Sequence, residues 1–174
     1  MKKIQLTQGQ FALVDDEDYE YLSQWKWYAH RRGEKYTYYA MRTDYTKGKV
    51  QIRMHNAIAL RYGLKDYEEL DHADRNGLNN QKDNLRVCTR GENNFNRRKF
   101  GELPKGVRIH KKKHTKKDGG VIIYTSYQAR INVNGKSVNL GLHKELKDAV
   151  KAYNDAALRY YPNFVYEEHT SVSQ

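Results

Sequence analysis

A carboxylate and an imidazole stand side by side in the middle of the chain, at Asp71 and His72. A second oxygen donor, the amide of Asn93, follows after a Gly/Asn-rich stretch and a short apolar run. Carboxylate and amide oxygens are hard ligands that suit a divalent cation, and an imidazole near such an ion can take a proton from water. The stretch 70–98 therefore predicts a metal site with Asp71 and Asn93 as ligands and His72 as general base.

Local signals around these residues indicate which elements position them. The apolar run at 84–88 predicts a second strand, which follows the strand that carries Asp71. Thr89 and Glu92 form the S/T-x-x-E pattern, in which two side chains cap the start of a helix reciprocally. We therefore expect strand, loop, strand and helix, an order that lets Asp71, His72 and Asn93 converge.

These residues resemble the HNH nucleases, the ββα-metal family, and in particular the homing endonucleases of phages and introns. Many members have histidine where this chain has Asn93, and asparagine also occurs there in the homing branch. The resemblance implies a nuclease that hydrolyses double-stranded DNA. The matching positions, in chain order, are Asp71, His72, Asn79, Asn80, Asn84, Leu85, Arg86, Thr89, Glu92 and Asn93.

The resemblance also implies roles for single residues. Asn84 is expected to brace the loop and to fix the orientation of His72. Two protein oxygen ligands leave positions for water and phosphate oxygens, which suits Mg²⁺, with Mn²⁺ as the alternative. Arg97 and Arg98 are expected to contact DNA, because they follow the site closely in the sequence.

Each part of this motif has an ordinary structural explanation when it is taken alone. The Asp-His pair could cap a turn, and the asparagines are common turn residues. The complete set in this order favours a nuclease. The alternative is a DNA-binding regulatory protein with an inactive nuclease motif. RNA binding is disfavoured, because the chain lacks an RNP-type aromatic motif.

The charge of the 174-residue chain is unevenly distributed. The net charge is +11, and residues 1–96 carry 16 basic and 14 acidic side chains, whereas residues 97–174 carry 16 and 7. Such a concentration of positive charge is typical of a nucleic-acid-binding surface.

The single cysteine, Cys88, excludes an internal disulfide and a thiolate-rich zinc site. We expect a cytoplasmic protein, because no apolar run reaches membrane-spanning length and the N-terminus is not of signal-peptide type.

Residues 1–69 predict a small mixed support region of short strands with helices at 15–25 and 55–62. Tyr19, Leu22 and Trp25 share one face of the first helix. The aromatic residues of this region favour a core rather than base stacking, and His55 is expected to be structural. Segments that resemble this N-terminal region precede the nuclease motif in phage HNH proteins.

The second half predicts a three-stranded antiparallel sheet on one helix. A linker is expected at 100–105 and a basic loop at 111–120, and Asn134-Gly135 is a strong hairpin signal. Alternation points Val138, Leu140 and Leu142 towards the helix that starts near Leu146. The residues expected on the exposed face, as contacts to DNA, are Arg108, Gln128, Arg130, Asn132 and Asn139.

This half resembles the plant Apetala-type, or ethylene-response-factor, DNA-binding domain, which phage HNH endonucleases also carry. The resemblance covers about residues 105–166, with GVR at its start and AYNDAALRYYPNF near its end. It implies base recognition from the sheet. No tryptophan follows Trp27, so only Arg108 and Arg130 carry over as contacts.

Together these signals predict an α+β protein with two functional parts. The expected function is a metal-dependent homing endonuclease that selects its site through the second part and acts as a monomer or homodimer. The expected divisions are an HNH nuclease domain at 1–99 with its catalytic core at about 68–99, a linker at 100–105, a DNA-binding domain at 106–168 and a tail at 169–174.

Overall fold

The computed structural model describes residues 1–34, 36–46, 48–97 and 101–164. It is an α+β protein, as the sequence predicts, and its contacts divide it into a first unit, residues 1–93, and a second unit, residues 94–174. The predicted DNA contact Arg98 and the predicted tail at 169–174 lie outside the described residues. In the described part, no helix is long and apolar enough to cross a membrane.

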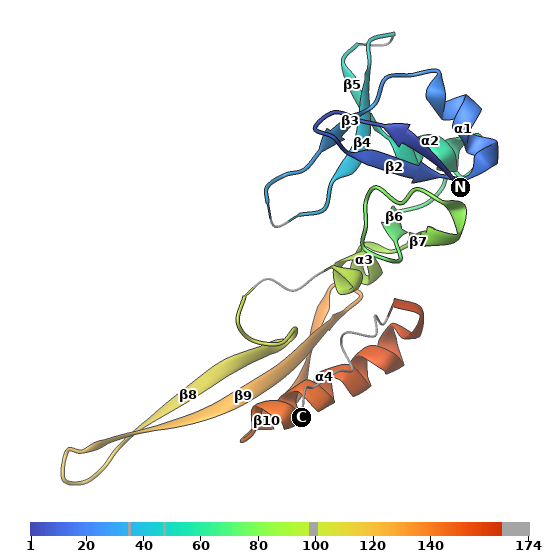
Figure 1. The fold of residues 1–174 in the computed structure, drawn as a ribbon. Helices are drawn as coiled ribbons and strands as arrows, with labels where there is room; N and C mark the ends of the chain where they lie inside the picture. The colour runs from blue at the N-terminus through green and yellow to red at the C-terminus, as the bar shows by residue number, and fades with distance from the viewer. Residues whose placement is uncertain (35, 47, 98–100, 165–174) are drawn as a thin grey trace. The chain divides into compact units, whose positions relative to one another are not determined.

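Small antiparallel sheets and the helices α1 and α2 build most of the first unit (Figure 1). Leu22, Met54 and Ile58 are almost fully buried at the centre of its core, and Trp27 packs with them. Trp27 is therefore a core residue, as predicted. The elements are β1 Lys2–Gln5, β2 Phe11–Val14, α1 Asp16–Ser23, β3 Tyr28–His30, β4 Tyr39–Asp44, β5 Val50–Arg53 and α2 Met54–Arg61.

A buried carboxylate fixes α1 against α2. Asp18 is fully buried, and its Oδ1 forms an ion pair with Arg61 Nη1 at 3.1 Å and accepts a hydrogen bond from the Tyr62 hydroxyl at 3.0 Å. These partners offset the large cost of removing a charge from water. The helix predicted to reach Trp25 ends at Ser23 instead, because the indole of the core residue Trp27 donates to the carbonyl oxygen of Leu22 at 2.8 Å.

The predicted strand, loop, strand and helix are present in the predicted order. β6 Glu69–His72 pairs with β7 Leu85–Cys88, and Asp71 lies opposite Arg86. A 3-10 helix, Lys82–Asn84, precedes β7, and α3 Arg90–Asn96 follows it.

The loop between β6 and β7 is docked on the N-terminal region. Leu13 of β2 donates its N–H to the carbonyl of Leu78 and accepts from the N–H of Asn80, both at 2.8 Å. The carboxylate of Asp15 accepts from the N–H of Lys82, also at 2.8 Å. The support region therefore holds the loop at two separate points.

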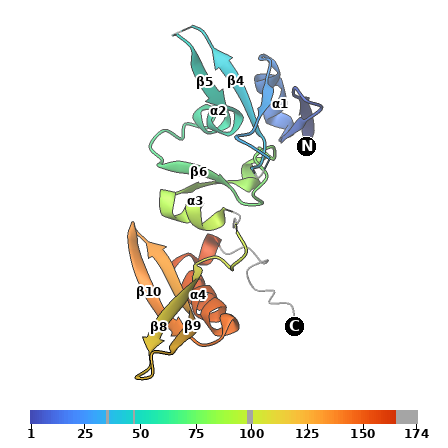
Figure 2. The same ribbon diagram turned by 90° about the vertical axis from the view of Figure 1, so that its left-hand side faces the viewer.

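The second unit is a three-stranded antiparallel sheet with α4 along one face (Figure 2). The predicted basic loop at 111–120 is shorter in the structure, because residues 111–115 pair in register with residues 121–125. The chain turns at 116–120, where Lys116 N–H donates to the Gly120 carbonyl at 2.7 Å. The elements are β8 Val107–Thr115, β9 Val121–Val133, β10 Lys136–His143 and α4 Leu146–Tyr160.

The prediction that Leu142 faces the helix is wrong. A register shift between Asn139 and Gly141 inserts one extra residue into β10. Leu142 consequently lies opposite Gln128 on the exposed face and is 55% exposed.

Gly106 allows the start of β8 to approach α4 closely. A Cβ at this position would lie 2.0 Å from Tyr153 Cδ2 and 2.7 Å from the carbonyl oxygen of Arg130, and φ is +74°. The backbone is fixed there by the hydrogen bond from Arg130 N–H to the Gly106 carbonyl at 2.8 Å. Any side chain at Gly106 therefore displaces the packing of Tyr153.

We predict that Gly106→Ala destabilises the second unit by about 1–3 kcal/mol more than Gly119→Ala, because overpacking adds to the strain of a positive φ. Gly119 is a matched control, since its φ is +80° and nothing lies within 4 Å of its Cβ position. Hydrogen exchange of amides in β9 and α4 measures the difference. Equal protection in both variants would contradict the predicted clash.

Candidate functional site

Asp71 lies on one face of β6 with Glu69, since alternate residues of a strand share a face. The Asp71 side chain is buried, and its Oδ2 accepts hydrogen bonds from Arg86 Nε at 3.0 Å and Nη2 at 2.8 Å. Arg86 is thus the cation that accompanies this carboxylate, and it holds the carboxylate in a defined orientation.

Asn93 lies over the same face of β6. Its Nδ2 donates to Glu69 Oε2, and Arg90 Nε also donates to Glu69, at 3.4 Å. The predicted capping box holds the start of α3, because Glu92 Oε2 accepts from Thr89 N–H at 2.8 Å and Glu92 N–H donates to Thr89 Oγ1 at 3.3 Å. The cap therefore fixes the helix that brings Asn93 to the strand of Asp71.

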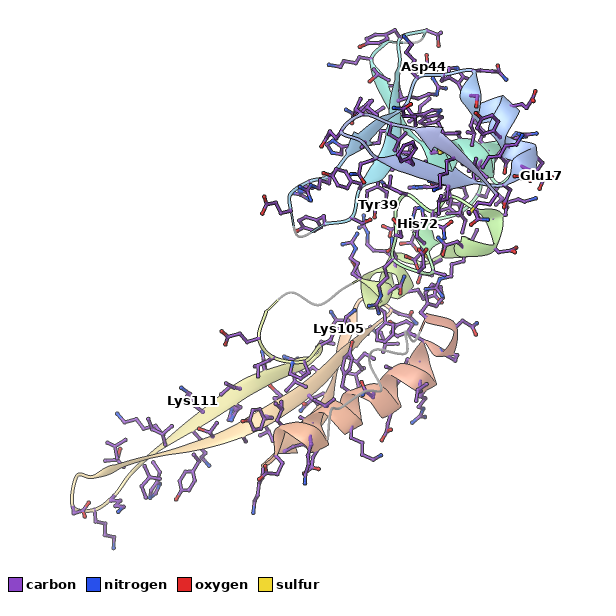
Figure 3. The ribbon with its side chains drawn as sticks, viewed as in Figure 1. Glu17, Tyr39, Asp44, His72, Lys105 and Lys111 are labelled. Carbon is purple, nitrogen blue, oxygen red and sulfur yellow. The ribbon has the colours of Figure 1, made fainter. Side chains whose placement is uncertain are left out.

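His72 occupies the opposite face of β6 and is buried. Its Nε2 is 3.3 Å from Asn80 Oδ1, and its ring is 4.9 Å from that of His55 and 5.8 Å from that of Tyr39 between centroids. Figure 3 shows Tyr39 and His72 close together. Burial lowers the pKa of His72, so the imidazole is neutral at neutral pH and able to accept a proton.

Asn84 holds the two ends of the loop together. Its Nδ2 donates to Asp74 Oδ1 at 3.0 Å and to the Asn79 carbonyl at 2.7 Å, while its Oδ1 accepts from Asp74 N–H at 2.9 Å. Asn80 of this loop contacts His72 directly, whereas the bonds of Asn84 are to Asp74 and Asn79. Asn84 thus fixes the conformation of the loop that carries Asn80.

Five residues of this site were assigned no role in it from the sequence, although Asn80 and Arg86 are among the positions that match the nuclease motif. Arg86 could have been found from the antiparallel register, and Glu69 from its position two residues before Asp71. His55, which was expected to be structural, is buried with its ring against that of His72, and only the tertiary fold reveals that contact. The five are Tyr39, His55, Glu69, Asn80 and Arg86.

The oxygen donors on this face of β6 suit a hard divalent cation. Within the described ranges, no group of three His, Cys, Asp or Glu side chains is arranged to hold a metal ion. The chemistry of Asp71, Asn93 and the neighbouring Glu69 nevertheless fits a cation that completes its shell with water and phosphate oxygens. The residues present therefore fit Mg²⁺ by donor type.

The predicted DNA contacts of the second unit form a polar row across the exposed face of the sheet. Arg108 Nε donates to Gln128 Oε1 at 2.8 Å, and Gln128 Nε2 donates to Asn139 Oδ1 at 3.1 Å. Arg130 is half-buried, and Asn132 is exposed on the same strand face. Arg97, just after α3, is exposed. Three of the predicted contacts are thus linked by hydrogen bonds before any ligand binds.

The sequence is similar to that of an uncharacterized HNH endonuclease of Acanthamoeba polyphaga mimivirus. The two are 27% identical over 157 residues, which cover 90% of this chain and 73% of the viral protein. No family model matches the chain, and no solved structure matches it. The similarity supports an HNH-type nuclease.

The buried His55 predicts acid sensitivity of the first unit. Burial, with further contributions from His72 and Arg53, lowers the pKa of His55 from 6.5 to about 3. Between these pH values the unfolded chain binds a proton that the folded chain does not, so the free energy of unfolding decreases as pH falls from 6.5 towards 3.

Urea unfolding at several pH values measures this effect. We expect His55→Phe to flatten the pH dependence and His30→Phe, at an exposed histidine, to leave it unchanged. An undiminished pH dependence in His55→Phe would assign the effect to other groups.

Proposed function

We propose that this protein is a metal-dependent DNA endonuclease of the HNH homing type, which hydrolyses phosphodiester bonds at a site selected by its second unit. β6 presents Asp71 on the face where Asn93 lies and His72 on the opposite face, and this arrangement is the observation that supports the proposal. A ligand and a base on adjacent residues can then act on the same phosphate from different sides.

Asp71 and Asn93 would hold the cation, Mg²⁺ or Mn²⁺, with Glu69 beside them. The cation supplies Lewis-acid polarisation of the phosphate and stabilisation of the leaving oxygen. Arg86 keeps the Asp71 carboxylate oriented through its two hydrogen bonds. The phosphate itself completes the site, which accounts for a set of only a few protein donors.

His72 takes the proton from the attacking water in this proposal. An amide oxygen can only accept, so the contact of Nε2 with Asn80 Oδ1 places the ring proton on Nε2. Nδ1 is then the unprotonated ring nitrogen, the one that takes the proton in this proposal. Asn84 supports this geometry by closing the loop that carries Asn80.

The second unit would select the target through the exposed face of its sheet. Arg and Gln or Asn side chains can pair bidentately with guanine and adenine in the major groove. Arg108, Gln128 and Asn139 are preorganised by their mutual hydrogen bonds, so less side-chain entropy is lost on binding. Arg130 and Asn132 would add base contacts, and Arg97 would contact phosphate.

A DNA-binding regulatory protein with an inactive nuclease motif is the second candidate. It is favoured by one observation, the occupation of Asp71 Oδ2 by the guanidinium of Arg86. If that ion pair persists on DNA, it competes with a metal ion for the carboxylate. Nuclease activity therefore decides between the two.

We predict that the full chain nicks supercoiled plasmid DNA in the presence of Mg²⁺ and that EDTA stops the nicking. Asp71→Ala and Asn93→Ala should abolish nicking and leave DNA binding in place, because most of the net positive charge lies in residues 97–174. Asp66→Ala, at an exposed carboxylate, is the matched control and should nick normally. Asn93→His restores the commoner family residue and should retain activity. DNA binding without any nicking by the wild-type chain would favour the regulatory protein.

We predict that His72→Ala lowers the nicking rate by about two to four orders of magnitude, the usual contribution of general-base catalysis. Binding of Mn²⁺, followed by electron paramagnetic resonance, should persist. His72→Gln tests the same point with less loss of buried volume. Loss of Mn²⁺ together with activity would make His72 a metal ligand and not the base.

A further inference from the structure

Beyond the part of the sheet that α4 covers, β8 and β9 continue as a two-stranded ribbon (Figure 1). β10 pairs with β9 only from Tyr127 to Val133, whereas β8 and β9 remain paired out to Thr115 and Val121. We call residues 110–126 the ribbon. Its six paired rows extend for about 20 Å at the rise of a β-strand.

The ribbon is strongly basic. It contains five lysines and one acidic residue, Asp118, which gives a net charge of +4. The residues at 110–121 are all exposed, so none of these charges is buried against the rest of the unit. Lys111 is labelled on β8 in Figure 3.

The lysines lie on both faces of the ribbon. Lys112 pairs with Tyr124 on the face that also carries Arg108. Lys111 and Lys113 point to the opposite face, and Lys113 pairs with Ile123. Both cross-strand partners are more than half exposed, at 55% for Tyr124 and 60% for Ile123. Each face thus combines a cation with an apolar side chain that is open to solvent.

A two-stranded ribbon of this kind is only marginally stable in water on its own. Its exposed apolar residues contribute little to folding, and its like charges repel one another at close range. A polyanion that surrounds the ribbon would relieve that repulsion. The major groove of DNA is about 12 Å wide, admits a two-stranded β-ribbon and has phosphates along both walls.

We propose that the ribbon is a DNA-binding arm that lies in the major groove, with lysines on its two faces contacting the phosphates of the two strands. The inference rests on the proposed action on DNA and adds a partner surface to it. Charge on both faces favours a groove over a flat anionic surface, which one face alone would contact. The arm extends the row of Arg108 and Gln128 by about six base pairs, at 3.4 Å per base pair.

A charge-matched pair of triple variants tests the proposal in the full chain. Both remove three positive charges from exposed lysines of the second unit, one set on the ribbon and the other near the start of α4. The ribbon variant carries Lys111→Gln, Lys112→Gln and Lys113→Gln; the control variant carries Lys144→Gln, Lys147→Gln and Lys151→Gln.

Affinity for a mixed-sequence DNA duplex is measured in EDTA over a range of salt concentrations. The plot of log K against log salt concentration has a negative slope, and this slope should become less steep by about 2–3 in the ribbon variant. Each lost phosphate contact reduces the steepness by about 0.9, and the control variant should change little. Hydroxyl-radical footprinting should show a footprint shorter by about six base pairs in the ribbon variant alone.

Equal slopes and footprints in the two variants overturn the arm while leaving the nuclease proposal intact, provided that the wild-type chain binds and nicks DNA. If the wild-type chain binds no DNA duplex, both the DNA-binding arm and the proposed nuclease function are wrong. A ribbon variant that matches the control on DNA and loses binding to phosphatidylserine vesicles would assign the ribbon to a lipid surface.

Discussion

The docking of the loop between β6 and β7 onto β2 is the constraint on which the candidate site depends. Two backbone hydrogen bonds at Leu13 and the carboxylate of Asp15 fix a segment that has little regular structure of its own. Asn80 and Asn84 lie in or next to this segment, so the orientation of His72 is set by the N-terminal region. The support region thus positions the residues of the candidate site without contributing one of the proposed reacting groups.

Among the described residues of the first unit, the buried polar side chains leave no charge without a partner. Asp18, Asp71, Asn84 and the two histidines are buried, and each buried charge has a cationic partner at hydrogen-bond distance. The histidines avoid the cost of an unpaired charge differently, by remaining neutral. A small core can therefore contain chemically active groups without losing its specific fold.

Features that depend on a short stretch of the chain were predicted correctly from the sequence. The capping box of Thr89 and Glu92, the strand and helix order around the motif and the turn at Asn134-Gly135 all appear in the structure. The sequence did not predict the extra residue in β10 that exposes Leu142, or the pairing of residues 111–115, because both depend on cross-strand register. The contacts of His72 with His55 and of Asp71 with Arg86 likewise join segments that only the fold brings together.

The charge of the ribbon opposes the pairing of its own exposed strand edge with a second copy. Among the described residues, no strand pairs with its β8 edge, and Val121 and Ile123 are exposed beside it. This combination is a template for pairing with another copy. The lysines act as gatekeepers against such edge-to-edge assembly, because two aligned ribbons would bring rows of like charge together. The same lysines thus oppose edge-to-edge pairing and carry the charge that a polyanion would neutralise.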